Sequence, residues 1–153
     1  MFVWLTKAGS WGAVWLALGL ALALVRRSPR PFVLVLLADA AAQGIADALK
    51  SAVGSHRPHG YDPLVAVPHS PSFPSGHATS SFACATVLSA LAPRLAPAFV
   101  LLAAAVAYSR LYVGVHWPLD VVAGSALGVL VGTVLLSPLA RRARRERGGH
   151  SAR

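Results

Sequence analysis

Residues 109–120 read Ser-Arg-Leu-Tyr-Val-Gly-Val-His-Trp-Pro-Leu-Asp and stand at the border between two apolar runs. This stretch holds an arginine, a histidine and a carboxylate, namely Arg110, His116 and Asp120. Such side chains are rare beside a bilayer unless they are paired or used. Two other polar stretches have the same character, KSAVGSHRP at 50–58 and PSGH at 74–77. The rest of the chain is best understood by asking how it brings these three stretches together.

The composition is that of a membrane protein. Of the 153 residues, 56% are hydrophobic and only 12% are charged, and the mean hydropathy is +0.60. Soluble domains have about 25% charged residues. The net charge of +9 does not indicate nucleic acid, because the basic residues lie in short polar gaps and at the C-terminus. The single cysteine, Cys84, excludes an intrachain disulfide and is expected to serve in packing.

Five apolar segments predict an all-α integral membrane bundle of about five transmembrane helices. They cover residues 11–25, 31–49, 76–92, 97–113 and 118–137, or about 22–30 Å each. The first is followed by several arginines instead of a cleavage site, which indicates a retained helix with Trp4, Trp11 and Trp15 near an interface. We therefore expect a transmembrane domain at 1–140 and a basic cytoplasmic tail at 141–153.

Charge asymmetry predicts the orientation of the bundle in a plasma membrane. Ten of the fourteen basic residues fall on one side, which should be cytoplasmic: Arg26, Arg27, Arg30, Arg94, Arg141, Arg142, Arg144, Arg145, Arg147 and Arg153. The three polar stretches then all lie on the extracytoplasmic side. They stand at the end of the second predicted helix, the start of the third, the end of the fourth and the start of the fifth. This convergence predicts a single site.

Two patterns predict how the helices pack. Asp39, Gln43, Asp47 and Lys50 share an arc of about 80° on the second helix. We expect Asp39 and Gln43 to form a polar seam inside the bundle, and Asp47 to pair with Lys50. Small residues in the third helix, and a four-residue glycine repeat in the fifth, predict close helix contacts; the repeat is Gly124, Gly128 and Gly132.

The cations and the start of the third helix suit an anion. Lys50, Arg57 and Arg110 supply three permanent positive charges, and arginine can hold two phosphate oxygens at once. Ser75 and Gly76 open the third helix, where unpaired N–H groups favour an anion and glycine permits close approach. Ser75 is also a candidate helix cap. These residues are the predicted phosphate-binding set.

The two histidines are the candidate catalytic groups. His116 and Asp120 are four residues apart, so the carboxylate can accept from one imidazole nitrogen and leave the other free to attack. His77, in the first turn of the third helix, suits protonation of a leaving oxygen. His56, His59 and His69 share a loop rich in proline and glycine, but their spacing is weak support for zinc.

Lys50-x6-Arg57-Pro58, Pro74-Ser75-Gly76-His77 and Ser109-Arg110-x5-His116-x3-Asp120 together resemble the signature of the type 2 phosphatidic acid phosphatase (PAP2) superfamily. The resemblance implies a haloperoxidase-like helical core and a phosphatase that needs neither metal nor cofactor. It implies His116 as the nucleophile, Asp120 as its orienting partner and His77 as the acid. Many members have six helices, and we expect this chain to lack the first.

Three hypotheses follow. The first is a membrane enzyme that dephosphorylates a lipid through a phosphohistidine. Its candidate substrates are polyprenyl diphosphates such as undecaprenyl diphosphate, polyprenyl-linked sugar phosphates, phosphatidylglycerophosphate and phosphatidate. The second is a non-catalytic lipid-phosphate binder or translocator, and the third is a vanadate-dependent haloperoxidase. About 15 residues separate Pro58 from Pro74, too few for a large lid, so loose headgroup selection is expected.

Overall fold

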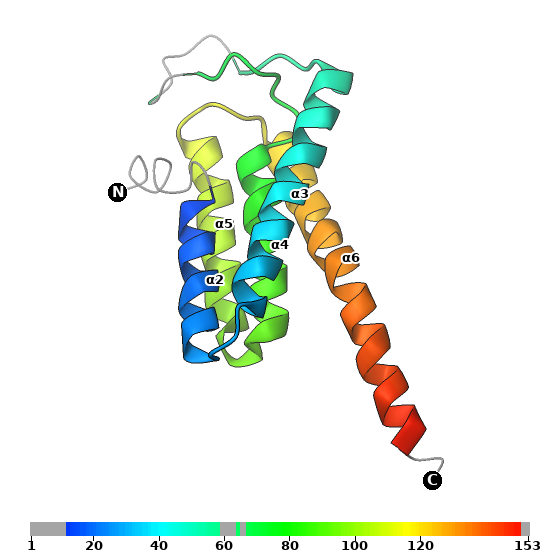
Figure 1. The fold of residues 1–153 in the computed structure, drawn as a ribbon. Coiled ribbons are helices and arrows are strands. Elements are labelled where there is room, and N and C mark those ends of the chain that lie inside the picture. Colours follow the sequence, from blue (N-terminus) through cyan, green and yellow to red (C-terminus); the bar gives the residue numbers. More distant parts are fainter. Residues whose placement is uncertain (1–11, 59–63, 65–66, 151–153) are drawn as a thin grey trace.

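The computed structural model describes residues 12–58, 64 and 67–150, with side chains up to residue 137. This part of the chain is all-helical and contains no strand, which confirms the predicted fold class. Its helices are α2 (Ala13–Val25), α3 (Arg30–Val53), α4 (Gly76–Leu91), α5 (Ala96–Tyr112) and α6 (Pro118–His150), with a short 3₁₀ turn at Pro93–Leu95 (Figure 1). Among these described residues, three apolar stretches are long enough to cross a membrane, namely Arg30–Val53, Pro93–Tyr112 and Pro118–Ser137, and α2 is a shorter apolar helix.

Helix α4 lies at the centre of the bundle and packs against α3, α5 and α6 (Figure 1). Its sequence explains this position, because small and hydroxyl-bearing residues such as Ala78, Thr79 and Ala83 present little bulk to the neighbouring helices and are fully buried. The first turn of the central helix is therefore surrounded by the ends of three others.

The glycine repeat brings α6 against α4. A Cβ placed on Gly124 would lie 2.7 Å from the carbonyl oxygen of Ser75, and one on Gly132 would lie 2.8 Å from that of Ala83. Gly128 is packed in the same way. Only glycine permits this approach, which confirms the predicted packing. The contact fixes the first turn of α6 beside the first turn of α4.

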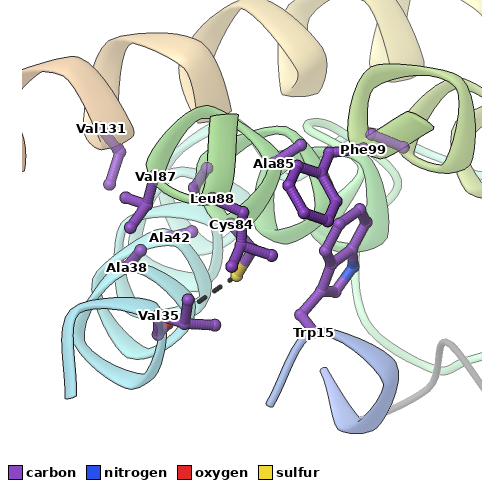
Figure 2. Close-up of a cluster of buried hydrophobic side chains, with 12 residues drawn as sticks. Trp15, Val35, Ala38, Ala42, Cys84, Ala85, Val87, Leu88, Phe99 and Val131 are labelled. Carbon is purple, nitrogen blue, oxygen red and sulfur yellow. Dashed lines mark hydrogen bonds between the residues drawn. The ribbon is translucent and has the colours of Figure 1, made fainter. Parts of the chain in front are cut away.

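The apolar core joins α2, α3, α4 and α5 around Trp15, Val35, Leu88 and Phe99 (Figure 2). Trp15, expected near a membrane interface, has a side chain that is only 1% exposed in this core, and Trp4 and Trp11 lie outside the described residues. The Trp15 indole nitrogen donates to Ser81 Oγ at 3.1 Å, and this internal partner allows the ring to be buried. Cys84 is fully buried and packs on α3, as predicted.

Two positions on the polar face of α3 are paired. Asp39 is buried and accepts a hydrogen bond from Ser80 Oγ on α4. One turn from the end of the helix, Lys50 Nζ lies 3.2 Å from Asp47 Oδ1. The Asp39 part of the predicted seam and the predicted Asp47–Lys50 pair are confirmed, and the part assigned to Gln43 stays a prediction.

Two helices run past their predicted ends. Helix α3 continues to Val53 and ends at Gly54, whose φ of 62° is favourable for glycine and whose N–H donates to Lys50 O. The predicted last apolar segment, 118–137, is confirmed as the membrane-length stretch Pro118–Ser137, and α6 continues as a helix beyond it to His150. The alanine, arginine and glutamate residues of this continuation are strong helix formers.

Candidate active site

All eight predicted site residues lie at one end of the bundle, where α3 and α5 end and α4 and α6 begin (Figure 1). Lys50 is in the last turns of α3, and Arg57 follows that helix. Ser75, Gly76 and His77 form the start of α4. The remaining three come from the segment that links α5 to α6 and from its borders: Arg110, His116 and Asp120. The predicted convergence of four helix ends is confirmed.

The start of α4 presents a hydroxyl and a bare backbone. Ser75 is the N-cap residue, but its fully buried Oγ makes no capping bond and has no partner among the described residues. Its N–H donates to Asp120 O at 3.0 Å, which ties α4 to α6. A Cβ on Gly76 would lie 3.2 Å from Lys50 Nζ, so the lysine ammonium sits directly against this turn. The arrangement suits an anion.

Arg110 and His77 carry buried polar atoms that lack a protein partner. The Arg110 side chain is almost fully enclosed, yet its Nε and Nη1 make no hydrogen bond within the described part of the chain. The same holds for His77 Nε2. Buried donors without partners are costly and uncommon, so such a cluster points to a bound polar ligand. Lys50, Arg57, Arg110 and His116 all lie close enough to act electrostatically on His77.

Arg57 links two loops beside the site. Its Nε donates to Ser70 O at 2.8 Å, its Nη2 donates to Pro71 O at 3.3 Å, and its Nη1 donates to Val115 O at 2.8 Å. The same Nη1 lies 3.4 Å from His116 Nε2. Arg57 Nη1 therefore faces both the Val115 carbonyl and the His116 ring, while Nε and Nη2 bind the backbone of the other loop. This structural role was not predicted from the sequence.

His116 is held on both ring nitrogens. Its Nδ1 lies 3.4 Å from Asp120 Oδ2, and its Nε2 faces Arg57. Asp120 Oδ2 also accepts from the backbone N–H of Trp117 at 2.8 Å. Burial, and then the charges of Arg57 and Arg110, lower the pKa of His116 more than Asp120 raises it. The ring is therefore neutral at neutral pH and keeps a lone pair.

Two serines near the site were missed. Ser72 is fully buried, donates to Asp120 Oδ2 and lies 3.4 Å from His116 Nδ1. Ser55 Oγ accepts from the backbone N–H of Phe73 at 2.7 Å, so it supports the same loop. Nothing in the sequence separates Ser72 from its neighbour Ser70, because only the folded loop shows which hydroxyl points inward.

Two of the other loop histidines, His56 and His69, lie among the described residues. The side chains of His56 and His69 are exposed, and His59 lies outside the described residues. Within the described residues, no three His, Cys, Asp or Glu side chains come together as a metal-binding group.

These features define a class: an all-helical membrane protein with a cluster of cations and two imidazoles at converging helix ends. A family model described as the PAP2 superfamily matches residues 12–144, and the chain belongs to that superfamily. It is thus a phosphoric-ester hydrolase of the PAP2 type and an integral membrane protein.

Curated relatives and solved structures agree with this assignment. The chain is 39% identical over 127 residues to the decaprenylphosphoryl-5-phosphoribose phosphatase of Mycobacterium tuberculosis, covering 79% of this chain and 69% of the relative. It is 32% identical over 133 residues to an undecaprenyl-diphosphatase of Sulfolobus acidocaldarius, covering 84% and 64%. A PAP2-type phosphatidylglycerolphosphate phosphatase from Bacillus subtilis superposes with a TM-score of 0.75 at 26% identity, covering 92% of this chain and 75% of that one.

Proposed function

We propose that this protein hydrolyses the phosphate ester or diphosphate of a membrane lipid, with His116 as the nucleophile. The observation that carries the proposal is the setting of His116, whose Nδ1 lies 3.4 Å from Asp120 Oδ2 while its Nε2 lies 3.4 Å from Arg57 Nη1. A neutral imidazole with an oriented lone pair is the form required for attack on phosphorus.

In the first step, His116 Nε2 attacks phosphorus and the bond from phosphorus to the leaving oxygen breaks. His77, in its protonated form, donates a proton to that oxygen, so a monoester releases the lipid alcohol and a diphosphate releases the lipid monophosphate. The charges of Lys50, Arg57 and Arg110 stabilise the negative charge on the transferring group, and Ser75 Oγ adds a hydrogen bond. The product on the enzyme is a phosphohistidine.

In the second step, water attacks the phosphohistidine and the N–P bond breaks. His77, now neutral, accepts the proton from the attacking water, and inorganic phosphate is released. Both imidazoles return to their starting states. Three permanent cations supply the charge neutralisation, so we propose that the reaction proceeds without a metal ion.

A polyprenyl phosphate or diphosphate is the favoured substrate class, with phosphatidylglycerophosphate or phosphatidate as the next candidates. Two of the relatives are named for decaprenyl and undecaprenyl substrates. An apolar groove of about 300 Å³ lies between α3 and α6, lined by Ala41, Ile45, Leu127, Leu130, Val131, Val134 and Leu135. It begins roughly 7 Å along α3 from Lys50, at the helix rise of about 1.5 Å per residue. A lipid tail would fit there while its phosphate reaches the pocket.

We propose that the site faces the extracytoplasmic side of the plasma membrane. The arginine-rich connection between α2 and α3 lies at the opposite end of the bundle, as does the part of the basic tail at residues 141–150 (Figure 1). Positive residues of this kind mark cytoplasmic loops. In this proposal residues 1–140 form the phosphatase domain and residues 141–153 a cytoplasmic tail.

The test is phosphate release by the purified protein in detergent, with EDTA present, from an isoprenoid diphosphate and from phosphatidate. We expect release in the chelator and its loss in His116→Ala. Full activity of that variant would contradict the assignment of the nucleophile, and dependence on an added metal would contradict the metal-free mechanism.

A further inference from the structure

We propose that Ser72 is a positioning residue for His116: its hydroxyl holds the Asp120 carboxylate and selects the imidazole tautomer that keeps the lone pair on Nε2. This inference rests on the proposed nucleophilic role of His116. Ser72 lies outside the three motifs that carry the family resemblance, two residues before Pro74. It is fully buried although its side chain is polar.

The hydrogen count fixes the direction of each bond. A serine hydroxyl has one hydrogen, and Ser72 donates it to Asp120 Oδ2, because an ionised carboxylate can only accept. The 3.4 Å contact from Ser72 Oγ to His116 Nδ1 is then a hydrogen bond only if Nδ1 carries the proton. The 3.4 Å contact from Asp120 Oδ2 to the same nitrogen sets the same condition.

The opposite side of the ring leads to the same tautomer. Arg57 Nη1 lies 3.4 Å from His116 Nε2, and a guanidinium can only donate. His116 Nε2 is therefore the acceptor and carries the lone pair. Ser72, Asp120 and Arg57 together specify which nitrogen is nucleophilic, and Ser72 does so without contacting the pocket side of the ring.

The Ser72 hydroxyl is itself held in place by the backbone. The Ser72 N–H donates to Ser55 O at 2.9 Å, and the next N–H, of Phe73, donates to Ser55 Oγ at 2.7 Å. On the other side of Ser72, Arg57 binds the carbonyl oxygens of Ser70 and Pro71. The loop is thus fastened at both sides of the residue whose hydroxyl enters the site, as a positioning role requires.

The charged groups around His116 give the role a measurable consequence. Arg57 and Arg110 disfavour the imidazolium, Asp120 favours it, and His77 is the other titratable ring nearby. A hydrogen bond from Ser72 weakens the pull of Asp120 on the imidazolium. Without that bond the carboxylate stabilises the protonated ring more strongly, so the pKa of His116 should rise.

The experiment compares Ser72→Ala with the wild-type full chain in detergent micelles, using farnesyl diphosphate as the probe. We expect kcat to fall roughly 10-fold, the scale of a slightly misplaced reacting group, and KM to stay within about twofold because the cations are intact. The acid limb of the profile of kcat/KM against pH should move to higher pH. Ser89→Ala is the matched control, since its buried hydroxyl has no described partner and lies near the other end of α4.

Ser72→Cys keeps the test decisive if the alanine variant does not fold. A thiol is nearly the same size but a weak donor, so the same shift of the acid limb is expected with a smaller loss of kcat. The inference would be overturned if a folded Ser72 variant showed the wild-type dependence of kcat/KM on pH. It would also be overturned if kcat fell and the acid limb did not shift. If His116→Ala is inactive in the same assay, only the role of Ser72 fails; if His116→Ala is active, the proposed function fails as well.

Discussion

Arg57 Nη1 lies 3.4 Å from His116 Nε2, and the same nitrogen donates to Val115 O, the carbonyl just before the histidine. One side chain therefore sets both the backbone and the ring of the proposed nucleophile. The motif at residues 50–58 is thus more than a source of charge, because its arginine joins the outer loop to the segment that carries His116.

Replacing Arg57 with lysine should therefore be severe although the charge is kept. Lysine has a single nitrogen and cannot hold Ser70, Pro71 and Val115 at once. We expect kcat/KM to fall about 100-fold or more, the scale of a displaced catalytic group. Steady-state kinetics on Arg57→Lys test this, with Arg94→Lys, an exposed position near the opposite end of the bundle, expected to match the wild type. Equal activity of the two variants would show that charge alone matters at position 57.

The pH profile should reflect the environment of His116. Because burial and the nearby arginines lower the pKa of this base, it stays neutral and able to attack below the ordinary histidine range. Activity should be lost only as the pH falls through that lowered value. We therefore expect the acid limb of kcat/KM to lie below about pH 6.5, the unperturbed value. A limb above pH 7 that persists with substrates of different phosphate pKa would contradict this.

A side chain at Gly76 should disturb the position of Lys50. A methyl group there would meet Lys50 Nζ at 3.2 Å and push the ammonium away from the start of α4 by a few tenths of an ångström. We expect Gly76→Ala to raise KM and lower kcat/KM about 10-fold or more, since the phosphate would lose a charge-assisted contact. Gly44→Ala is the control, because nothing lies within 4 Å of its added methyl group. Unchanged KM and kcat/KM in Gly76→Ala would show that Lys50 does not contribute to phosphate binding.

The groove between α3 and α6 gives a prediction about chain length. Ile45→Trp should fill part of the groove and obstruct a long tail, whereas a short substrate should be unaffected. We expect KM to rise several-fold for a long polyprenyl diphosphate and to stay unchanged for a five-carbon isoprenoid diphosphate. Leu101→Trp, on the exposed face of α5, is the matched control. An equal rise in KM for both chain lengths would show that the groove does not bind the lipid tail.

The sequence predicted most of what the fold needs to form a site. Hydropathy and breaks at proline, glycine and charge located the helices, and the order of the polar stretches predicted which helix ends meet. The glycine repeat predicted the contact of α6 with α4, because only close packing explains three glycines on one face. These features are readable because they depend on periodicity and local composition.

Features that depend on tertiary contacts could not be predicted from the sequence. Trp15 was expected at an interface, but a single partner, Ser81, allows it to be buried. The roles of Ser72 and of Arg57 as a loop clamp depend on loop geometry that no spacing rule encodes. The helical continuation of α6 from its apolar span to His150 was also not predicted, because hydropathy marks the span and not the helix end.

The most direct test of the central claim is to trap the phosphoenzyme. The protein would be mixed with a diphosphate labelled with ³²P in the terminal phosphate, quenched in base within the first turnover and digested. We predict an acid-labile, base-stable label on the peptide that carries His116, present in the wild type and absent from His116→Ala. A label on another residue, or phosphate release by His116→Ala at the wild-type rate, would contradict the account.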